Sequence, residues 1–515
     1  MNGAECLLRT LVASGVDTCF MNPGTSEMQF VSALDRVPGM RGVLGLFEGV
    51  CSGAADGYAR MTGRPAATLL HLGPGLANGL ANFHNARKAR SPVISIVGQH
   101  STEHLRQDAP LTADIEGLAR PVSGYVRTVG RAEDMGREAA AAVEAARAAP
   151  GQVATLIVPA DFSWSEAGEP ACARPPAERP RPRPERIRDA AAILRRSEPA
   201  GLLLGGSTLL AAGFEPAARL AAAGVRVFGY RNGARYQQGG GRMAPPRLPY
   251  FPEAAEAALA GLRHLLLVEC AAPVSFFGYP GRRSQVAPVD CAIHELASVE
   301  EDGAAALQAL GEELGWPPAA SPDARMPLPE WPRDAALTPD SIGRVLAHLL
   351  PDDAMVSDET VSSGEPIWRH LASGPAHDLL PVAGGSIGQG LPVAVGAAVA
   401  CPDRKVTALE SDGSGLYTPQ ALWTMARERL DVIVVILGNR RYRILDIEMR
   451  RTGAGEVGPR ANDMMDLRRP DVDWVKLSEG LGVEASRART VEEFAERLRV
   501  GVRQSGPVLI EAMME

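Results

Sequence analysis

The chain has 515 residues, of which 45% are hydrophobic and 22% charged, and its formal net charge is −8. A chain of this length exceeds what a single hydrophobic core supports and should divide into about three domains. The negative charge argues against nucleic acid or an anionic membrane as a partner, and it favours a small-molecule substrate.

The seven cysteines are scattered singly between Cys6 and Cys401, without a C-x-x-C pair. This pattern is typical of reduced thiols in a cytoplasmic protein. The N-terminus has no basic region followed by an apolar core, so no signal peptide is expected. No window reaches transmembrane length either. We therefore expect a cytoplasmic location.

Apolar runs that resemble buried strands alternate with alanine-rich helical stretches along the chain. Two proline-rich stretches, 171–184 and 316–336, are typical of linkers and predict domains at residues 1–170, 185–318 and 335–515. The alternation predicts the α/β class, with three doubly wound parallel-sheet domains. The expected strands are 43–46, 67–71, 93–97 and 153–158, then 201–204, 225–228 and 265–268, and finally 354–357, 406–409, 432–437 and 508–511.

Two polar residues, Asp412 and Asn439, each follow an apolar run in the last domain. Between the runs, Thr418 and Pro419 provide an N-cap and a first helical residue, so a βαβ unit is predicted. Its right-handed crossover puts the carboxyl ends of both strands at one sheet edge, where such sheets bind ligands. An acid and an amide without a nearby His or Cys suit Mg²⁺ with a diphosphate. The alternative is that Asp412 begins a turn with Gly413 and Asn439 caps a strand.

The glycine-rich stretches 73–79 and 384–390 each precede a helix of small residues. Glycines there can admit a phosphate to a helix N-terminus, but they also serve close helix packing. Neither stretch carries a G-x-G-x-x-G fingerprint with a ribose-binding acid. A nicotinamide dehydrogenase, which the α/β pattern alone would allow, therefore lacks its signature.

Further motifs at 22–25, 47–49 and 54–59, together with the βαβ unit, occur in a specific order along essentially the whole chain. In this combination the sequence resembles the thiamine diphosphate-dependent 2-oxo acid decarboxylases and carboligases. The relevant branches are acetolactate synthase and benzoylformate decarboxylase. The resemblance implies a pyrimidine-binding, a middle and a diphosphate-binding domain, in that order.

The resemblance implies that Mg²⁺ is held by Asp412, by Asn439 and by the main-chain carbonyl of Arg441. Ser411 and Gly438 depart from the family pattern, which has Gly and Asn there, but neither change removes a ligand side chain. The cofactor-binding positions that the family pattern implies are Ser362, Ile387, Gly413, Ser414 and Gln99. Ile387 matches the apolar wedge that bends the cofactor, and Ser362 and Ser414 match hydrogen bonds to its diphosphate.

Glu48 matches the residue that activates the cofactor in this family. It follows a strand-like run and opens a helix, so its carboxyl group should have little access to water. Limited solvation favours the protonated form, which can donate to a ring nitrogen of the aminopyrimidine. An isolated Glu would more often stabilise a helix N-terminus.

His71 ends a predicted strand and matches an active-site His of the benzoylformate decarboxylase branch, where it handles protons. Thr25 stands where the aromatic-acid decarboxylases have Ser, which keeps the hydroxyl and adds bulk. That branch takes a second His from the middle domain, whereas this chain has Phe277 about there. His84, His100 and His104 are possible substitutes, although each is by default a surface or helix residue.

The resemblance implies thiamine diphosphate- and Mg²⁺-dependent decarboxylation of a small 2-oxo acid, followed by protonation to an aldehyde or addition to a second carbonyl. The alternatives are an acetolactate synthase-type carboligase and a catalytically idle paralogue that binds the cofactor. FAD is not expected, because the middle segment is short for an FAD-carrying acetolactate synthase. The family also implies a homodimer or homotetramer with active sites between subunits.

Overall fold

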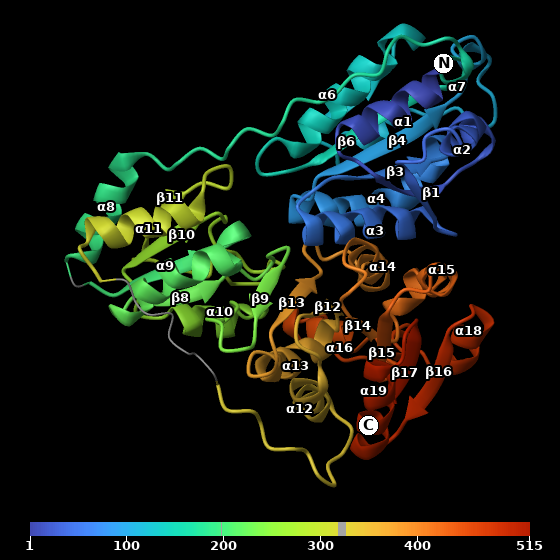
Figure 1. Ribbon diagram of the computed structural model, residues 1–515. Coiled ribbons are helices and arrows are strands. Elements are labelled where there is room, and N and C mark those ends of the chain that lie inside the picture. The colour runs from blue at the N-terminus through green and yellow to red at the C-terminus, as the bar shows by residue number, and fades with distance from the viewer. Residues whose placement is uncertain (197, 318–325, 515) are drawn as a thin grey trace.

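Three mostly parallel sheets, each covered by helices, form the molecule (Figure 1). The computed structural model describes residues 1–196, 198–317 and 326–514. The α/β class with three parallel-sheet units is confirmed. None of the helices in these ranges is long and apolar enough to cross a membrane.

The first sheet has six parallel strands in the order β2-β1-β3-β4-β6-β5. Its central strands are buried on both faces, as the unbroken apolar runs predict. The strands are β1 (Thr18–Asn22), β2 (Arg41–Leu44), β3 (Ala66–Leu70), β4 (Val93–Gln99), β5 (Tyr125–Thr128) and β6 (Val153–Pro159). The helices are α1 (Gly3–Ala13), α2 (Met28–Leu34), α3 (Glu48–Thr62), α4 (Leu72–Ala89), α5 (Ile115–Ala119), α6 (Met135–Arg147) and α7 (Ala160–Trp164).

The middle sheet is smaller, with four parallel strands in the order β11-β10-β7-β8. The strands are β7 (Ala200–Leu204), β8 (Arg226–Gly229), β10 (His264–Val268) and β11 (Ala292–Ala297). The helices are α8 (Pro184–Leu194), α9 (Ala211–Ala222), α10 (Pro252–Leu259) and α11 (Gly303–Glu313).

The third sheet has seven strands in the order β16-β17-β15-β14-β12-β13-β9. Its edge strand β9 (Tyr236–Gln238) comes from the middle segment and pairs antiparallel with β13. The other strands are β12 (Ala354–Glu359), β13 (His377–Pro381), β14 (Val406–Ser411), β15 (Val432–Gly438), β16 (Glu484–Ala488) and β17 (Val508–Met513). The helices are α12 (Pro339–Leu349), α13 (Gly364–Leu371), α14 (Gly390–Ala400), α15 (Gln420–Glu428), α16 (Arg443–Arg451), α17 (Pro459–Asp463), α18 (Trp474–Gly480) and α19 (Val491–Arg503).

Helices α3 and α14 join the first unit to the third (Figure 1). Small residues allow their backbones to touch: a side chain at Gly57 would collide with the backbone of Val393, and one at Gly396 with the carbonyl of Ala54. The motif at 54–59 is therefore a packing surface as well as a family signature.

Each predicted strand overlaps an observed one, but the predicted N-cap at Thr418 is wrong. Helix α15 begins at Gln420, and the Thr418 hydroxyl donates to the Gly388 carbonyl at 3.1 Å instead of capping the helix. Residue 318, the predicted end of the middle domain, and part of the second predicted linker lie outside the described residues. The limits 1–170, 185–318 and 335–515 stay a prediction.

Candidate functional site

Asp412 and Asn439 lie at one edge of the third sheet, as the βαβ pattern predicts. Strands β14 and β15 pair in parallel, and Ser411 lies opposite Leu437. The Asp412 carboxylate accepts hydrogen bonds from the backbone N–H of Gly413, at 2.9 Å, and from that of Arg440. The metal ligands that the family pattern implies are therefore adjacent in space.

Asp412 is only 7% exposed, and this burial raises its pKa to about 6. A divalent cation at this edge would favour the ionised form. Within the part of the chain that the structure describes, no three His, Cys, Asp or Glu side chains converge on one point. A metal here would be held by the Asp412 carboxylate with the amide of Asn439 and the carbonyl of Arg441, an oxygen set that fits Mg²⁺.

A loop rich in glycine carries Ile387 beside this edge. The Glu359 carboxylate accepts from the backbone N–H groups of Gly388 and Gln389, at 2.5 and 2.7 Å, and from that of Gly390. Ile387 itself is only partly buried and does not belong to the hydrophobic core. An isoleucine held out of the core on a fixed loop fits an apolar support for a ligand.

Ser414 and Ser362, the predicted diphosphate contacts, follow β14 and β12. The Ser414 hydroxyl is hydrogen-bonded to Glu410. Burial, together with the charge of Glu359, raises the pKa of Glu410 well above its usual range. A protonated Glu410 can donate to Ser414 and leave the serine hydrogen free for a phosphate oxygen.

Three residues next to predicted site positions have left-handed backbones that only glycine adopts without cost. They are Leu72 (φ 50°) after His71, Val361 (φ 47°) before Ser362, and Arg440 (φ 56°) after Asn439. Such conformations cost of order 1–3 kcal/mol each and gather at functional sites. Three of the nine non-glycine residues with positive φ among the described residues therefore adjoin predicted site positions.

Glu48 is the first residue of α3 and lies past the carboxyl end of β2. It is 9% exposed, and the Asn78 amide donates to its Oε2 at 3.0 Å. Its place at a dry sheet edge is as predicted. Gln99, the last residue of β4, is buried at the same edge, and its Oε1 accepts from the His100 N–H at 2.9 Å.

His71 has a partner that the sequence did not reveal. Its Nδ1 lies 2.8 Å from Oε2 of Glu27, which also accepts from the Gly24 N–H at 2.9 Å. Burial raises the pKa of Glu27, although the His71 imidazole opposes this shift. Thr25 is exposed at the start of the same short 3-10 turn. The signal for Glu27 was an acid three residues after a glycine at a helix start, whose carboxylate reaches back to the Gly24 N–H as the acid of a capping box does.

The possible substitutes for a second active-site His separate into two groups. His84 lies on α4, and its Nε2 is 3.1 Å from the Gly384 carbonyl, so it supports the glycine loop. His100 and His104 lie beyond β4, with their ring centroids 5.1 Å apart. Phe277 is 51% exposed, and its ring contacts that of Phe276.

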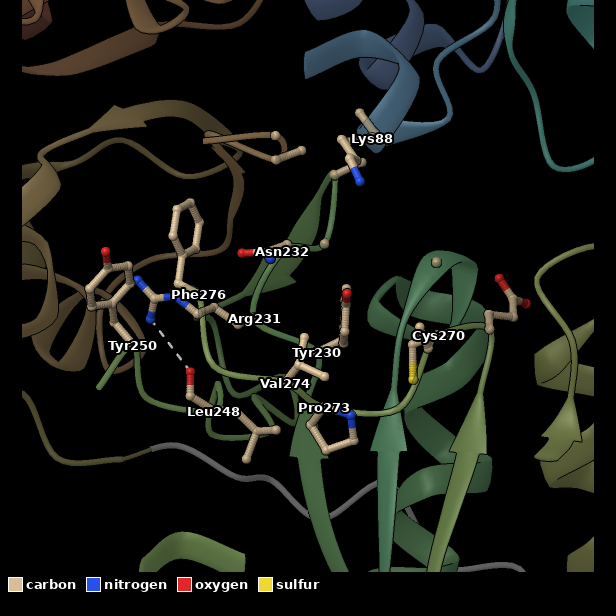
Figure 2. Close-up of a pocket in the computed structure, with 18 of the residues that line it drawn as sticks. Lys88, Tyr230, Arg231, Asn232, Leu248, Tyr250, Cys270, Pro273, Val274 and Phe276 are labelled. Atoms are coloured by element: carbon tan, nitrogen blue, oxygen red, sulfur yellow. Dashed lines mark hydrogen bonds between the residues drawn. The ribbon is translucent and has the colours of Figure 1, made fainter. Parts of the chain in front are cut away.

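A separate cavity of about 520 Å³ lies at the carboxyl ends of the middle strands (Figure 2). Figure 2 shows Arg231 beside Tyr250, and the guanidinium lies 4.8 Å from the ring centroid. Lys88 from α4 and Gly384 from the third unit complete the lining. Since a side chain at Gly385 would collide with Phe276, the cavity lies directly behind the Ile387 loop.

Comparison with known proteins agrees with this geometry. Residues 1–118 match the thiamine pyrophosphate enzyme N-terminal binding domain, and residues 366–512 match the C-terminal one. IlvX of Mycobacterium tuberculosis (strain H37Rv), provisionally named an acetolactate synthase large subunit, is 50% identical over 100% of this chain and 99% of its own length. Benzoylformate decarboxylase of Pseudomonas aeruginosa is 32% identical over 96% of each chain. The structure of the thiamine diphosphate-dependent 4-hydroxybenzoylformate decarboxylase of Rhodococcus jostii superposes with a TM-score of 0.86 at 26% identity, covering 100% and 99% of the two chains.

Proposed function

The chain belongs to the thiamine pyrophosphate enzymes of the acetolactate synthase and decarboxylase family, and from this premise we propose that it decarboxylates a 2-oxo acid and releases an aldehyde. Thiamine diphosphate, when bound, accepts the electron pair that the departing CO₂ leaves behind. The protein positions this cofactor, excludes water and supplies protons.

The C-terminal edge would hold the diphosphate end. Asp412, Asn439 and the Arg441 carbonyl supply oxygens to Mg²⁺, and Ser362 and Ser414 supply hydroxyls to the phosphates. Ile387 would support the cofactor from its fixed loop. The burial of Asp412 and its raised pKa support this assignment, since a buried acid without a cationic partner is costly unless a cation binds.

The N-terminal edge would perform the proton chemistry. The Glu48 carboxyl, which is largely removed from water, donates a hydrogen bond to the pyrimidine ring. Glu27 engages Nδ1 of His71 and leaves Nε2 as the nitrogen that moves a proton.

The Glu27–His71 pair is the single observation that most favours aldehyde release. Protonating the carbon that has lost CO₂ requires an acid at the site, and an oriented imidazole provides one. The 32% identity to a benzoylformate decarboxylase along 96% of the chain supports the same choice.

The second candidate is a carboligase that joins the acyl group to another carbonyl. The 50% identity to a protein named with the acetolactate synthases favours it. The two reactions differ only in what meets the acyl carbon after CO₂ leaves, a proton or a second carbonyl.

One incubation separates the candidates. Purified protein, thiamine diphosphate and Mg²⁺ are mixed with pyruvate, benzoylformate, and branched or indolic 2-oxo acids, and CO₂, aldehyde and acyloin are measured separately. Aldehyde equal to CO₂ supports the decarboxylase, whereas acetolactate from pyruvate supports the carboligase. Stoichiometric cofactor binding without any CO₂ would overturn both and point to an idle paralogue.

We also propose that the two edges meet across a homodimer or homotetramer. Large apolar side chains close to the predicted site residues are exposed in the single chain: Leu46 (45%) near Glu48, and Tyr417 (52%) and Leu445 (45%) near Asp412 and Asn439. A second copy would cover such surfaces.

A further inference from the structure

Three histidines follow neighbouring strands at the carboxyl edge of the first sheet. His71 follows β3 and His100 follows β4, which pair in parallel. His104 begins the next short 3-10 turn, His104–Gln107, and its ring meets that of His100 edge-on at 65°. The sheet therefore brings two further imidazoles beside the Glu27–His71 pair.

The burial of these side chains changes in steps from solvent to interior. His104 is exposed, His100 is partly buried, the His71 side chain is 21% exposed and the Glu27 side chain is fully buried. The Nε2 of His100 is buried without a hydrogen-bond partner, and so is Oε1 of Glu27. A buried polar atom that lacks a partner needs an explanation.

Gly98 leaves room beside β4 for one of these atoms, Oε1 of Glu27. It lies on β4, two residues before His100, and a side chain there would collide with the Glu27 carboxylate. His100 follows the last residue of β4, so it lies just beyond the point where the Glu27 carboxylate packs against the strand.

The electrostatics keep His100 in its neutral form. Burial lowers its pKa first, and the charges of His104 and His71 lower it further. Those two imidazoles are the titratable groups that face it, while the nearby Asp161 carboxylate is bonded to the backbone and hydroxyl of Thr102. A neutral imidazole can accept a proton on one nitrogen and release one from the other.

Aldehyde release consumes one proton in every turnover, because a 2-oxo acid anion and a proton give an aldehyde and CO₂. We propose that His104, His100 and the Glu27–His71 pair form a relay that carries this proton from solvent to the substrate carbon. The proposal rests on the decarboxylase function proposed above.

Each transfer in the relay breaks one bond to hydrogen and forms another. His104 takes a proton from water, His100 receives it and gives one to the Glu27–His71 pair, and His71 Nε2 delivers one to carbon. No oxidant or reductant is required. His100 is a positioning and relay residue in this scheme, and it compensates for the missing middle-domain His.

The test compares His100→Gln and His104→Gln with His294→Gln, a matched control on β11 of the middle sheet. With thiamine diphosphate, Mg²⁺ and the best substrate from the screen, aldehyde release should fall about 10- to 100-fold in His100→Gln and less in His104→Gln. His104 is exposed, so its variant should fold even if His100→Gln does not. Aldehyde rates equal to that of His294→Gln in both variants would overturn the relay.

An artificial oxidant separates the relay from the earlier steps. Oxidised dichlorophenolindophenol takes two electrons from the decarboxylated acyl group, and water supplies the oxygen of the acid product, so no proton need reach carbon. Dye-coupled CO₂ release should stay within about twofold of wild type in His100→Gln. An equal loss in this assay would contradict the relay, whereas no CO₂ from wild type with any substrate would contradict the proposed function instead.

A readout without cofactor tests the coupling directly. Imidazole NMR titration of the apo protein should show the pKa of His100 rising in both His104→Gln and His71→Gln, because each change removes a positive charge. His294→Gln should leave it unchanged. A His100 pKa that moves in neither variant would show that the three imidazoles do not communicate.

Discussion

The first and third sheets have the same architecture but present different chemistry at their carboxyl edges. The first presents proton-handling side chains, with Glu48 beside the Asn78 amide and Glu27 beside the His71 imidazole. The third presents oxygens and backbone N–H groups, with Asp412 bonded to the peptides of Gly413 and Arg440. The shared fold therefore provides the position of each site, and the residues at the strand ends decide its chemical role.

Removing the proposed metal ligand, Asp412, should have the largest effect at the edge of the third sheet. Asp412→Ala should weaken Mg²⁺-dependent binding of thiamine diphosphate by more than about 100-fold, beyond what loss of an outer-shell partner costs. Calorimetric titration measures it. Asp403→Ala, an exposed acid before the opposite end of β14, is the control. Equal affinity in the two variants would remove Asp412 from the metal site.

Changing the first-sheet edge should instead spare binding and suppress turnover. Glu48→Gln should retain the cofactor within a few-fold and lower kcat about 100-fold, because an amide cannot cycle a proton at the pyrimidine. Calorimetry measures the cofactor affinity and steady-state kinetics measures kcat on the same preparation. Glu133→Gln, at an exposed residue, is the control. Near-normal kcat in Glu48→Gln would refute the activation role.

Within the first-sheet edge, the Glu27–His71 pair should have a smaller effect on turnover than Glu48. Glu27→Gln should lower aldehyde release about tenfold, because a neutral amide cannot stabilise the imidazolium of His71. Since the two residues act as one unit, Glu27→Gln should cost much less in a His71→Gln background than in the wild type. A double-mutant cycle of kcat measures this coupling, and multiplicative effects would show that the residues act independently.

The smallest effect expected is a pH dependence confined to the third-sheet edge. The folded-state pKa of Asp412, about 6, exceeds its usual 3.8, so metal binding must displace a proton at low pH. Cofactor affinity should fall about twofold at pH 6 and about tenfold at pH 5 relative to pH 8. Asp403→Ala should keep this profile. A flat profile from pH 5 to pH 8 would contradict a raised pKa at the metal ligand.

The raised pKa of Asp412 also makes the stability of the protein depend on pH. Because the folded state binds the Asp412 proton more tightly than the unfolded state, this group lowers the free energy of unfolding as the pH rises from about 4 to about 6. Bound Mg²⁺ would offset that loss.

Sequence patterns predicted the strands and helices that depend mainly on the residues within them. The apolar, β-branched runs of β14 and β15 specify buried parallel strands, and so the shared edge of Asp412 and Asn439 follows from the chain itself. Family motifs then predicted roles for Glu48 and Ile387 at the cofactor. The short strand β9 was not predicted, because three residues carry little periodicity and its partner β13 lies 139 residues away from Gln238 at His377.

Contacts between segments far apart in the chain could not be predicted from the sequence either. Glu27 and His71 are 44 positions apart, and their pairing depends on strands β1 and β3 being neighbours. The carboxyl pair of Glu359 and Glu410 depends in the same way on the register of β12 and β14. Such partners emerge only once the sheet order is known.

The claim that the two edges form one site across two subunits is tested most directly by complementation. Glu48→Gln and Asp412→Ala each lose most of the activity alone in this scheme, and the two chains are co-expressed and purified together without separating the dimer types. If each site takes Glu48 from one subunit and Asp412 from the other, random mixing should restore about a quarter of the wild-type sites. Aldehyde release no greater than the sum of the two single variants would contradict it.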